Sequence, residues 1–345
     1  MNPASPAPPR KALILLSGGL DSTLAARVLR DQGIGLHAIH FTSPFCTCSH
    51  KVGENGSCRS QAQIVAEEMG IPIKTVSKGE EYLEVVKSPR HGRGSAMNPC
   101  IDCRIFTLRK ARSFMEEIGA SFLVTGEVLG QRPMSQRDDA LRRIEKYSGC
   151  SGLVLRPLSA QHLPPTVPER EGWVDRGKLL AITGRSRKEQ IRMAAELGIG
   201  DYPCPAGGCL LADRGFAAKV RDLVLHDPGF GMHDVLLLKA GRHFRVAGIK
   251  AVVAKSEPEN RRLEALCRGK HTVYVSQSHP GPSVALLGGN PEERIDLLGR
   301  ILTRYSKAGP PGPFEVLELS PRGERTVVAV PPNPEFAEVG RGLLC

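Results

Sequence analysis

The stretch KALILLSGGLDSTLAARVLR, residues 11–30, decides the fold. It begins with a continuous apolar run, which is typical of a strand buried on both faces of a parallel sheet. Leu20, Leu24 and Val28 then recur at every fourth position, the spacing of a helix that packs its apolar side on such a sheet. The stretch therefore predicts the first strand and the first helix of an α/β fold.

The chain continues this alternation of apolar strands and amphipathic helices. Four more strands are expected at residues 36–41, 71–76, 121–128 and 153–157, with helices between them at 60–69 and 104–118. Helices that connect successive apolar strands return the chain to the same end of the sheet, so the strands run parallel. This order predicts a doubly wound α/β domain.

We expect this domain to span residues 11–215. Beyond it, residues 216–320 predict a second, smaller α+β domain, with a β-like run at 235–241. The proline-rich residues 1–10 predict a disordered tail, because proline supplies no backbone donor and fixes φ. Residues 321–345 are left as a C-terminal tail. Two domains are in keeping with the length of 345 residues.

The composition narrows the function. Lys and Arg number 47 against 36 Asp and Glu, so the formal net charge is +11 and a polyanionic partner is expected. No apolar run approaches the ~20 residues of a membrane-spanning helix. The proline-rich start disfavours a secretory signal, so we expect a cytoplasmic protein with no membrane partner. Its 10 cysteines then predict metal binding or thiol chemistry, because the cytosol keeps thiols reduced.

A short loop joins the first strand to the first helix. It consists of Ser17, Gly18, Gly19, Leu20, Asp21 and Ser22. The glycine pair allows a tight turn, so that backbone N–H groups and the helix N-terminus can point at a phosphate. The two serine hydroxyls add donors, and Asp21 is expected to hold Mg²⁺ or to orient a nucleotide. A plain strand-to-helix turn, with Ser22 as the helix cap, is the alternative.

The string SGGLDS at the end of the first strand resembles the PP-loop signature of the ATP pyrophosphatases. Members of that family split ATP between the α- and β-phosphates and adenylate a carbonyl oxygen. The resemblance implies that the loop binds the departing pyrophosphate and that the adenine lies near the ends of the neighbouring strands. Those ends carry His40, Phe41 and Gly126.

Two cysteine-containing segments point to sulfur chemistry. In NPCIDCR, residues 98–104, Cys100 and Cys103 stand just before a predicted helix, where the helix N-terminus lowers a thiol pKa and both sulfurs can reach one metal centre. The segment PCPAGGCLL, residues 203–211, places Cys209 after two glycines that leave room for a close approach. Two half-buried cysteines or a lone redox pair are the alternatives.

These segments resemble the tRNA 2-thiouridine synthases, in the block NPCIDCRIFTLRKA…IGASFLVTGE and in SRKEQIRMAAELGI…GGCLL. By position, Cys103 and Cys209 match the two active cysteines of that family, and Cys100 falls where many members have Asp. The extra thiol favours the related iron–sulfur thiolases, in which three cysteines hold a [4Fe–4S] cluster. The resemblance thus implies Cys100, Cys103 and Cys209 as ligands, with Cys204 as a substitute for Cys209. A persulfide pair, Cys103 and Cys209, stays as the alternative.

A further group of metal-ligand residues follows the second predicted strand. It contains Cys46, Cys48, His50 and Cys58. These are zinc ligands by type, but their spacing matches no common zinc finger. The segment is therefore either a zinc site or a cysteine-rich loop over the active site.

Basic residues suggest RNA contacts in both domains. The residues expected to contact RNA are Arg132, Arg137, Arg245, Lys250, Arg261 and Arg262. The second domain resembles the RNA-binding part of the NFACT family, in HFRVAGIKAVVAKSEPENRRLEAL, in HPGPSVALLGG and in RYSK. With 5% aromatic residues, recognition by phosphate contacts is expected rather than base stacking. Solvated charged faces are the alternative.

Together these features predict an ATP-dependent tRNA sulfurtransferase that makes thiouridine. ATP, Mg²⁺ and a [4Fe–4S] cluster are the expected cofactors, and tRNA and a sulfur donor, either a cysteine desulfurase persulfide or sulfide, are the expected partners. Two other functions remain open from the residues. One is a PP-loop ligase or amidotransferase that acts on a small molecule, and the other is an RNA-binding translation factor regulated by a nucleotide.

Overall fold

The computed structural model describes residues 10–46, 51–52, 58–200, 208–277, 279–306 and 312–344. The chain divides into two compact units, Met1–Ala212 and Asp213–Cys345. The predicted tail at 1–9 lies outside the described residues. Within the described ranges, no helix is both long enough and apolar enough to span a bilayer.

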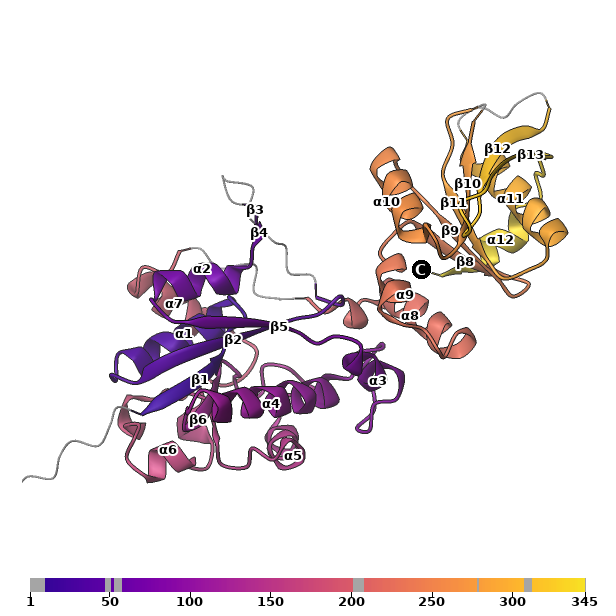
Figure 1. The fold of residues 1–345 in the computed structure, drawn as a ribbon. Helices are drawn as coiled ribbons and strands as arrows, with labels where there is room; N and C mark the ends of the chain where they lie inside the picture. The colour runs from indigo at the N-terminus through magenta and orange to yellow at the C-terminus, as the bar shows by residue number, and fades with distance from the viewer. Residues whose placement is uncertain are drawn as a thin grey trace, which may run out of the picture. The chain divides into compact units, whose positions relative to one another are not determined.

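The first unit contains a sheet of five parallel strands in the order β5-β2-β1-β6-β7 (Figure 1). These strands are β1 (Lys11–Leu15), β2 (Gly35–Thr42), β5 (Ile73–Ser77), β6 (Phe122–Thr125) and β7 (Val154–Leu155). A small two-stranded sheet pairs β3 (Lys51–Val52) with β4 (Cys58–Arg59). The strand order reverses between β1 and β6, and such a switch point is where open α/β sheets bind ligands. The predicted doubly wound parallel sheet is confirmed.

Helices cover both faces of this sheet. They are α1 (Leu20–Arg30), α2 (Gln61–Glu68), α3 (Glu81–Lys87), α4 (Cys100–Glu117), α5 (Asp138–Ser148), α6 (Val167–Arg170) and α7 (Lys188–Glu196). Three 3-10 turns are η1 (Ala160–His162), η2 (Arg176–Lys178) and η3 (Leu210–Ala212). Side chains of α1, α2 and α7 share one apolar cluster with the sheet, and those of α4 and α5 share another.

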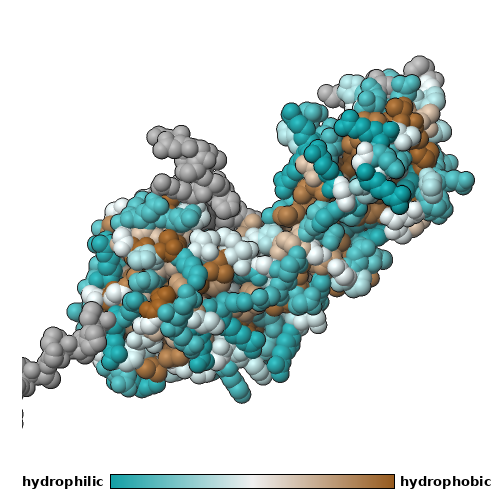
Figure 2. All heavy atoms as spheres, in the orientation of Figure 1, coloured by the Kyte–Doolittle hydropathy of each residue, from teal (hydrophilic) through white to brown (hydrophobic). Residues whose placement is uncertain are grey.

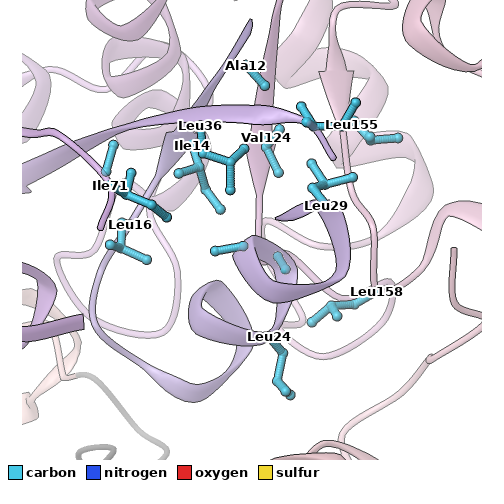
Figure 3. Close-up of a cluster of buried hydrophobic side chains, with 14 of the residues drawn as sticks. Ala12, Ile14, Leu16, Leu24, Leu29, Leu36, Ile71, Val124, Leu155 and Leu158 are labelled. Atoms are coloured by element: carbon cyan, nitrogen blue, oxygen red, sulfur yellow. The ribbon is translucent and has the colours of Figure 1, made fainter. Parts of the chain in front are cut away.

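Alternate residues of β1 explain the two clusters. Ala12 and Ile14 pack towards α1, and Leu13 packs towards α4 on the opposite face. Figure 3 shows Ile14 beside Val124 and Leu36 of the neighbouring strands. All of these side chains are 9% exposed or less, so the central strand is apolar on both sides, as its sequence predicted. Hydrophilic residues, in contrast, cover much of the visible face of each unit (Figure 2).

The second unit is built on a seven-stranded antiparallel sheet in the order β13-β12-β10-β11-β9-β8-β14. Its strands are β8 (Arg242–Val246), β9 (Ile249–Val253), β10 (Thr272–Ser276), β11 (Val284–Leu287), β12 (Phe314–Leu319), β13 (Arg325–Val330) and β14 (Leu343–Leu344). Its helices are α8 (Arg214–His226), α9 (Met232–Leu237), α10 (Glu257–Cys267), α11 (Pro291–Tyr305) and α12 (Ala337–Arg341). The predicted α+β class of this unit is confirmed.

Two local expectations for the second unit were wrong. The β-like run at 235–241 begins inside helix α9, because the Asp234 carboxylate accepts a hydrogen bond from the Gly231 N–H at 2.9 Å and so starts a helix. Residues 321–345, expected as a tail, supply β13, α12 and β14. β13 pairs with β12 across a short turn, whereas β14 pairs with the distant β8, a partner that no local pattern reveals.

Buried charges hold α8 against the start of this sheet. Asp222 is 4% exposed and lies 3.0 Å from the Lys250 ammonium and 2.8 Å from the Arg245 guanidinium. Burial alone would raise the pKa of Asp222, but hydrogen bonds from Arg245 and Lys250 hold it below its ordinary value. Lys250 is 2% exposed, so the expected RNA contact at this residue is contradicted. The Arg245 guanidinium is likewise occupied within the unit, because it pairs with Asp222 and Asp227.

We predict that Asp222→Ala destabilises the second unit by about 3–5 kcal/mol, because it leaves the buried Lys250 ammonium without its counter-charge and leaves Arg245 with Asp227 alone. Hydrogen exchange of β8 and β9 amides in the full chain measures this loss unit by unit. Asp296→Ala is the matched control, since it breaks an ion pair whose carboxylate is 49% exposed. Equal protection in the two variants would contradict the role of the buried charges.

Candidate active site

The predicted phosphate loop lies at the carboxyl end of β1, directly before α1. Gly18 has φ +75°, and a Cβ there would meet the backbone nitrogen of Ala62 at 2.5 Å. Ser22 Oγ donates to the Gly19 carbonyl at 2.9 Å and lies 3.0 Å from Ser17 Oγ. No side chain caps the N-terminus of α1. The loop is therefore held by its own serines, and the positive end of the helix dipole is left for an anion.

Gly126, which follows β6, packs directly on this loop. A Cβ at Gly126 would lie 2.5 Å from the Ser22 nitrogen and 2.6 Å from the Asp21 carbonyl oxygen. Backbone atoms cannot move away from such a contact without shifting α1. Gly126 therefore lets the ends of β1 and β6 meet at the loop.

Asp21 carries two long-range partners that the sequence analysis missed. Gln131 Nε2 donates to Asp21 Oδ2 at 2.9 Å, and the Arg187 guanidinium lies 3.4 Å from the same oxygen. The other oxygen, Oδ1, is buried without a hydrogen-bond partner in the described structure. A buried carboxylate oxygen with an unused lone pair suits a hard cation such as Mg²⁺.

Arginines gather around the buried Glu127, next to this loop. Arg104 and Arg156 each lie 3.1 Å from a Glu127 oxygen. Burial by itself would raise the pKa of Glu127, and the charges of Arg104 and Arg156 lower it instead. Desolvation, followed by repulsion from Arg104, lowers the pKa of Arg132, one of the residues expected to contact RNA. The strand ends thus present a cationic surface, which suits phosphate charge.

Among the residues predicted to lie near the adenine, His40 is held in place by a hydrogen bond. The His40 imidazole is 5% exposed, and its Nδ1 lies 2.9 Å from the Leu16 carbonyl. A carbonyl only accepts, so Nδ1 carries the proton and the ring ties the end of β2 to the end of β1. Phe41 packs partly buried against the apolar cluster that includes Leu13.

The CxxC motif opens α4, as expected. Cys100 is the first residue of the helix, and the Asn98 amide donates to its sulfur at 3.1 Å. Beside the motif, His91 Nδ1 lies 2.8 Å from Asp102 Oδ1 in a pair that is about one-tenth exposed. The Asp102 carboxylate also accepts the His91 N–H at 2.9 Å, which anchors the preceding loop to the first turn of α4.

Cys103 is the thiol whose pKa this environment lowers. Burial opposes ionisation, but the Lys78 ammonium, 3.0 Å from the sulfur, and the Tyr82 hydroxyl together lower the pKa of Cys103. Lys78 also lies 4.6 Å from the centre of the Tyr82 ring, which fixes its position. A thiolate is the form that binds metals and attacks electrophiles.

Cys209 is brought to the same place by a strand-like contact. Its backbone bridges that of Cys46, Leu210 N–H donates to the Phe45 carbonyl at 2.8 Å, and Met97 N–H donates to the Leu211 carbonyl at 3.0 Å. Burial, followed by the neighbouring charges of Cys103, Cys46 and Cys100, raises the pKa of Cys209 to about 11. The structure therefore gathers the three predicted sulfur residues and adds a fourth, Cys46.

The remaining cysteines either lie outside the described residues or are buried elsewhere. Cys204, Cys48 and His50 lie outside the described residues, and so does the side chain of Cys58. The predicted zinc set is therefore described only at Cys46, which lies beside Cys209. Cys150 and Cys267 are fully buried in apolar clusters, and burial raises the pKa of both.

Of the residues expected to contact RNA, four remain on the surface. Arg132 and Arg137 follow β6, and Arg137 lies 3.1 Å from Asp139. Arg261 and Arg262 lie exposed on α10, where Arg261 is 3.9 Å from Glu257. These four side chains can reach phosphates without breaking a buried pair.

Comparison with known proteins finds similarity in both units. Residues 9–162 match the family model described as thiamine biosynthesis protein (ThiI), and residues 241–336 match the NFACT protein RNA binding domain. The resemblance inferred from the motifs is confirmed. The first unit is similar to PP-loop tRNA thiouridine synthases, and the second unit is similar to the NFACT protein RNA binding domain.

Curated relatives agree with this. The chain is 28% identical over 345 residues to the tRNA-specific 2-thiouridylase MnmA of Mycobacterium leprae, covering 93% of this chain and 87% of the relative. It is 26% identical to MnmA of Marinobacter nauticus over 66% of this chain, and spans 57% of that relative's length. A solved 4-thiouridine synthetase–RNA complex with bound ATP matches 64% of this chain and 52% of its own, at 21% identity and a TM-score of 0.36.

We predict that Lys78→Gln slows alkylation of Cys103 by iodoacetamide several-fold at neutral pH. The ammonium favours the thiolate, so its removal raises the pKa of Cys103. The alkylation rate therefore increases at a higher pH than it does in the wild-type protein. Peptide mass spectrometry reads the rate at Cys103 alone. Lys74→Gln is the matched control, because Lys74 lies on β5, just before Lys78 in the chain, but pairs with Glu117 at 3.4 Å. An unchanged pH profile in Lys78→Gln would refute this electrostatic role.

Proposed function

We propose that this chain is an ATP-dependent tRNA sulfurtransferase. In this reaction the uridine carbonyl oxygen attacks the α-phosphorus of ATP and pyrophosphate leaves. A hydrosulfide ion, or the outer sulfur of a persulfide, then attacks the carbonyl carbon and displaces AMP. Hydrosulfide loses its proton, or a second cysteine thiolate attacks the persulfide's inner sulfur and forms a disulfide, which leaves thiouridine in the tRNA. Adenylation converts a poor leaving group, the carbonyl oxygen, into a good one, AMP.

One observation carries the proposal: the anion-binding loop and the thiol group belong to the same edge of one sheet. Lys78, directly after β5, lies 3.0 Å from the Cys103 sulfur, and the loop that holds Asp21 directly follows β1. Arg187 lies 3.4 Å from Asp21 in the loop. A PP-loop ligase for small molecules would need the loop alone, whereas these thiols serve a sulfur transfer.

The loop residues supply the adenylation step. The backbone of Ser17–Ser22 and the N-terminus of α1 receive the departing pyrophosphate, whose charge grows as the P–O bond breaks. Asp21 Oδ1, buried and unpartnered, is the atom that would hold Mg²⁺, which neutralises phosphate charge when bound. The adenine lies along His40, Phe41 and Gly126, with His40 tying β2 to β1 through Leu16.

The thiols supply the sulfur step, with Cys100, Cys103 and Cys209 holding or delivering the sulfur. Lys78 and Tyr82 lower the pKa of Cys103 and so favour its thiolate, and Asn98 donates to Cys100. Three soft thiolates on a helix start and a glycine-flanked turn fit a [4Fe–4S] cluster, which would leave one iron open for hydrosulfide. Without a cluster, Cys103 and Cys209 form the persulfide pair.

Measuring thiouridine and AMP in the same experiment distinguishes the adenylation step from the sulfur step. Asp21→Asn is expected to lose AMP formation and thiouridine alike, at least 100-fold, because it weakens the pyrophosphate site. Cys209→Ser is expected to lose thiouridine while tRNA-dependent AMP formation survives in part, because adenylation precedes sulfur attack. Cys150→Ser is the control with both activities retained. Nucleoside mass spectrometry of the tRNA and AMP release are the measurements.

AMP formation that ignores tRNA would contradict the proposal and favour a small-molecule ligase. The same preparations, purified without oxygen, report on the cluster. A brown protein with about four irons per chain, lost in Cys103→Ser, supports it. A colourless protein that thiolates tRNA from a persulfide donor would leave Cys103 and Cys209 as the pair and Cys100 as a bystander.

The second unit is proposed to dock the tRNA through exposed basic residues. We predict that Arg261→Ala with Arg262→Ala weakens tRNA binding about tenfold and lowers the slope of log affinity against log salt by roughly 1–2, one phosphate contact for each arginine. Filter binding over a salt series measures both. Arg192→Ala is the control, because Glu189 and Glu196 each lie 2.5 Å from its guanidinium and neutralise it. Unchanged affinity in the double variant would remove α10 from the interface.

A further inference from the structure

The second unit contains a cluster of metal-ligand side chains that the RNA-binding role does not use. His233 and Asp234 belong to α9, and His271 lies in the turn before β10. Each residue offers one ligand atom, and these atoms lie within 4.8 Å of one another. The two imidazole rings face each other at a tilt of 39°, with their centres 5.5 Å apart.

In each of the three residues, one possible ligand atom takes part in no hydrogen bond of the described structure. His233 Nε2 lies 2.6 Å from the Leu266 carbonyl, so that nitrogen carries the proton and Nδ1 keeps its lone pair. Asp234 Oδ2 accepts the Gly231 N–H at 2.9 Å, which leaves Oδ1. His271 Nε2 is buried without a hydrogen-bond partner in the part of the chain described.

A histidine whose second nitrogen donates to a backbone carbonyl is the usual arrangement around a protein-bound metal, because this bond fixes the tautomer and the ring. The Asp234 carboxylate has the same support from the Gly231 amide. Two of the three ligands, His233 and Asp234, therefore already have the supporting hydrogen bonds of a metal site.

The spacing argues against a simple His–Asp pair. His233 Nδ1 and Asp234 Oδ1 are 3.9 Å apart, too far for a hydrogen bond. Two ligands of a tetrahedral zinc ion stand about 3.4 Å apart when each bond is about 2.1 Å. A contraction of about 0.5 Å between these two atoms would bring them to that distance.

We propose that His233, Asp234 and His271 bind one zinc ion. Two imidazoles and a carboxylate favour zinc over magnesium or calcium, which prefer all-oxygen sites. Asp234 and His271 also line a cavity of about 550 Å³, whose wall includes Lys270 and Arg294. Three protein ligands leave a fourth position for a water on that side. This proposal concerns the second unit alone and does not rest on the sulfurtransferase function.

Zinc binding by the full chain tests the site. Isothermal titration with zinc chloride under reducing conditions is expected to show one more zinc per chain in the wild-type protein than in His271→Gln. All variants keep the cysteines of the first unit, so sulfur-bound zinc cancels in the difference. His226→Gln is the matched control, because His226 is an exposed histidine on α8 that lies outside the cluster. It should retain the wild-type stoichiometry.

Hydrogen exchange gives a second, local readout. Zinc is expected to slow exchange of α9 amides in the wild-type chain and in His226→Gln, because a ligand that binds only the folded state stabilises it. His271→Gln should show no such response. If His271→Gln fails to fold, Asp234→Asn replaces it, since an asparagine oxygen still accepts the Gly231 N–H. Equal zinc stoichiometry in wild type and a folded variant, or no effect of zinc on α9, overturns the proposal.

Discussion

The close contact between Gly126 and the first turn of α1 is the constraint on which the candidate site depends. The chain after β6 comes so near to Ser22 and Asp21 that a single methyl group would collide with backbone at 2.5 Å. This contact brings the ends of β1 and β6 together where the strand order reverses. The loop, Glu127 and the residues after β6 then share one surface. A ligand at this edge meets all of them at once, which is the general reason that α/β sheets bind ligands at a switch point.

Charge is buried in both units, and in each case the partners decide what the charge does. Glu127 is held ionised by Arg104 and Arg156, and Asp222 by Lys250 and Arg245. A buried ion without its partner is costly, so these groups are committed to the fold. The basic residues of the chain therefore divide into two sets. Those with buried counter-ions stabilise the units. Those on exposed surfaces, such as Arg261 and Arg262, belong to the excess of positive charge, +11 for the chain, that is available to a polyanion.

The thiols show how neighbours create chemical differences between identical side chains. Lys78 lowers the pKa of Cys103, while burial and nearby thiols raise the pKa of Cys209 to about 11. The surroundings thus favour the thiolate at Cys103 and the neutral thiol at Cys209. Binding of a metal centre would change this balance, because thiolate ligands release their protons on binding. The asymmetry suits a site that must both hold sulfur and hand it on.

Local sequence determined the five strands of the parallel sheet, helices α1, α2 and α4, the SGGLDS loop between β1 and α1, and the position of Cys100 and Cys103 at the start of α4. These features repeat at the period of a strand or a helix, or occupy a few consecutive residues, so the chain itself records them. Only the tertiary structure decided which distant groups meet. It placed Gln131 and Arg187 on Asp21, Cys46 beside Cys209, and Lys250 beneath α8 on Asp222. It also turned the expected C-terminal tail into strands of the second sheet. The reason is physical: a residue's exposure and its charged partners depend on how separate elements pack, and packing brings together positions up to 166 residues apart.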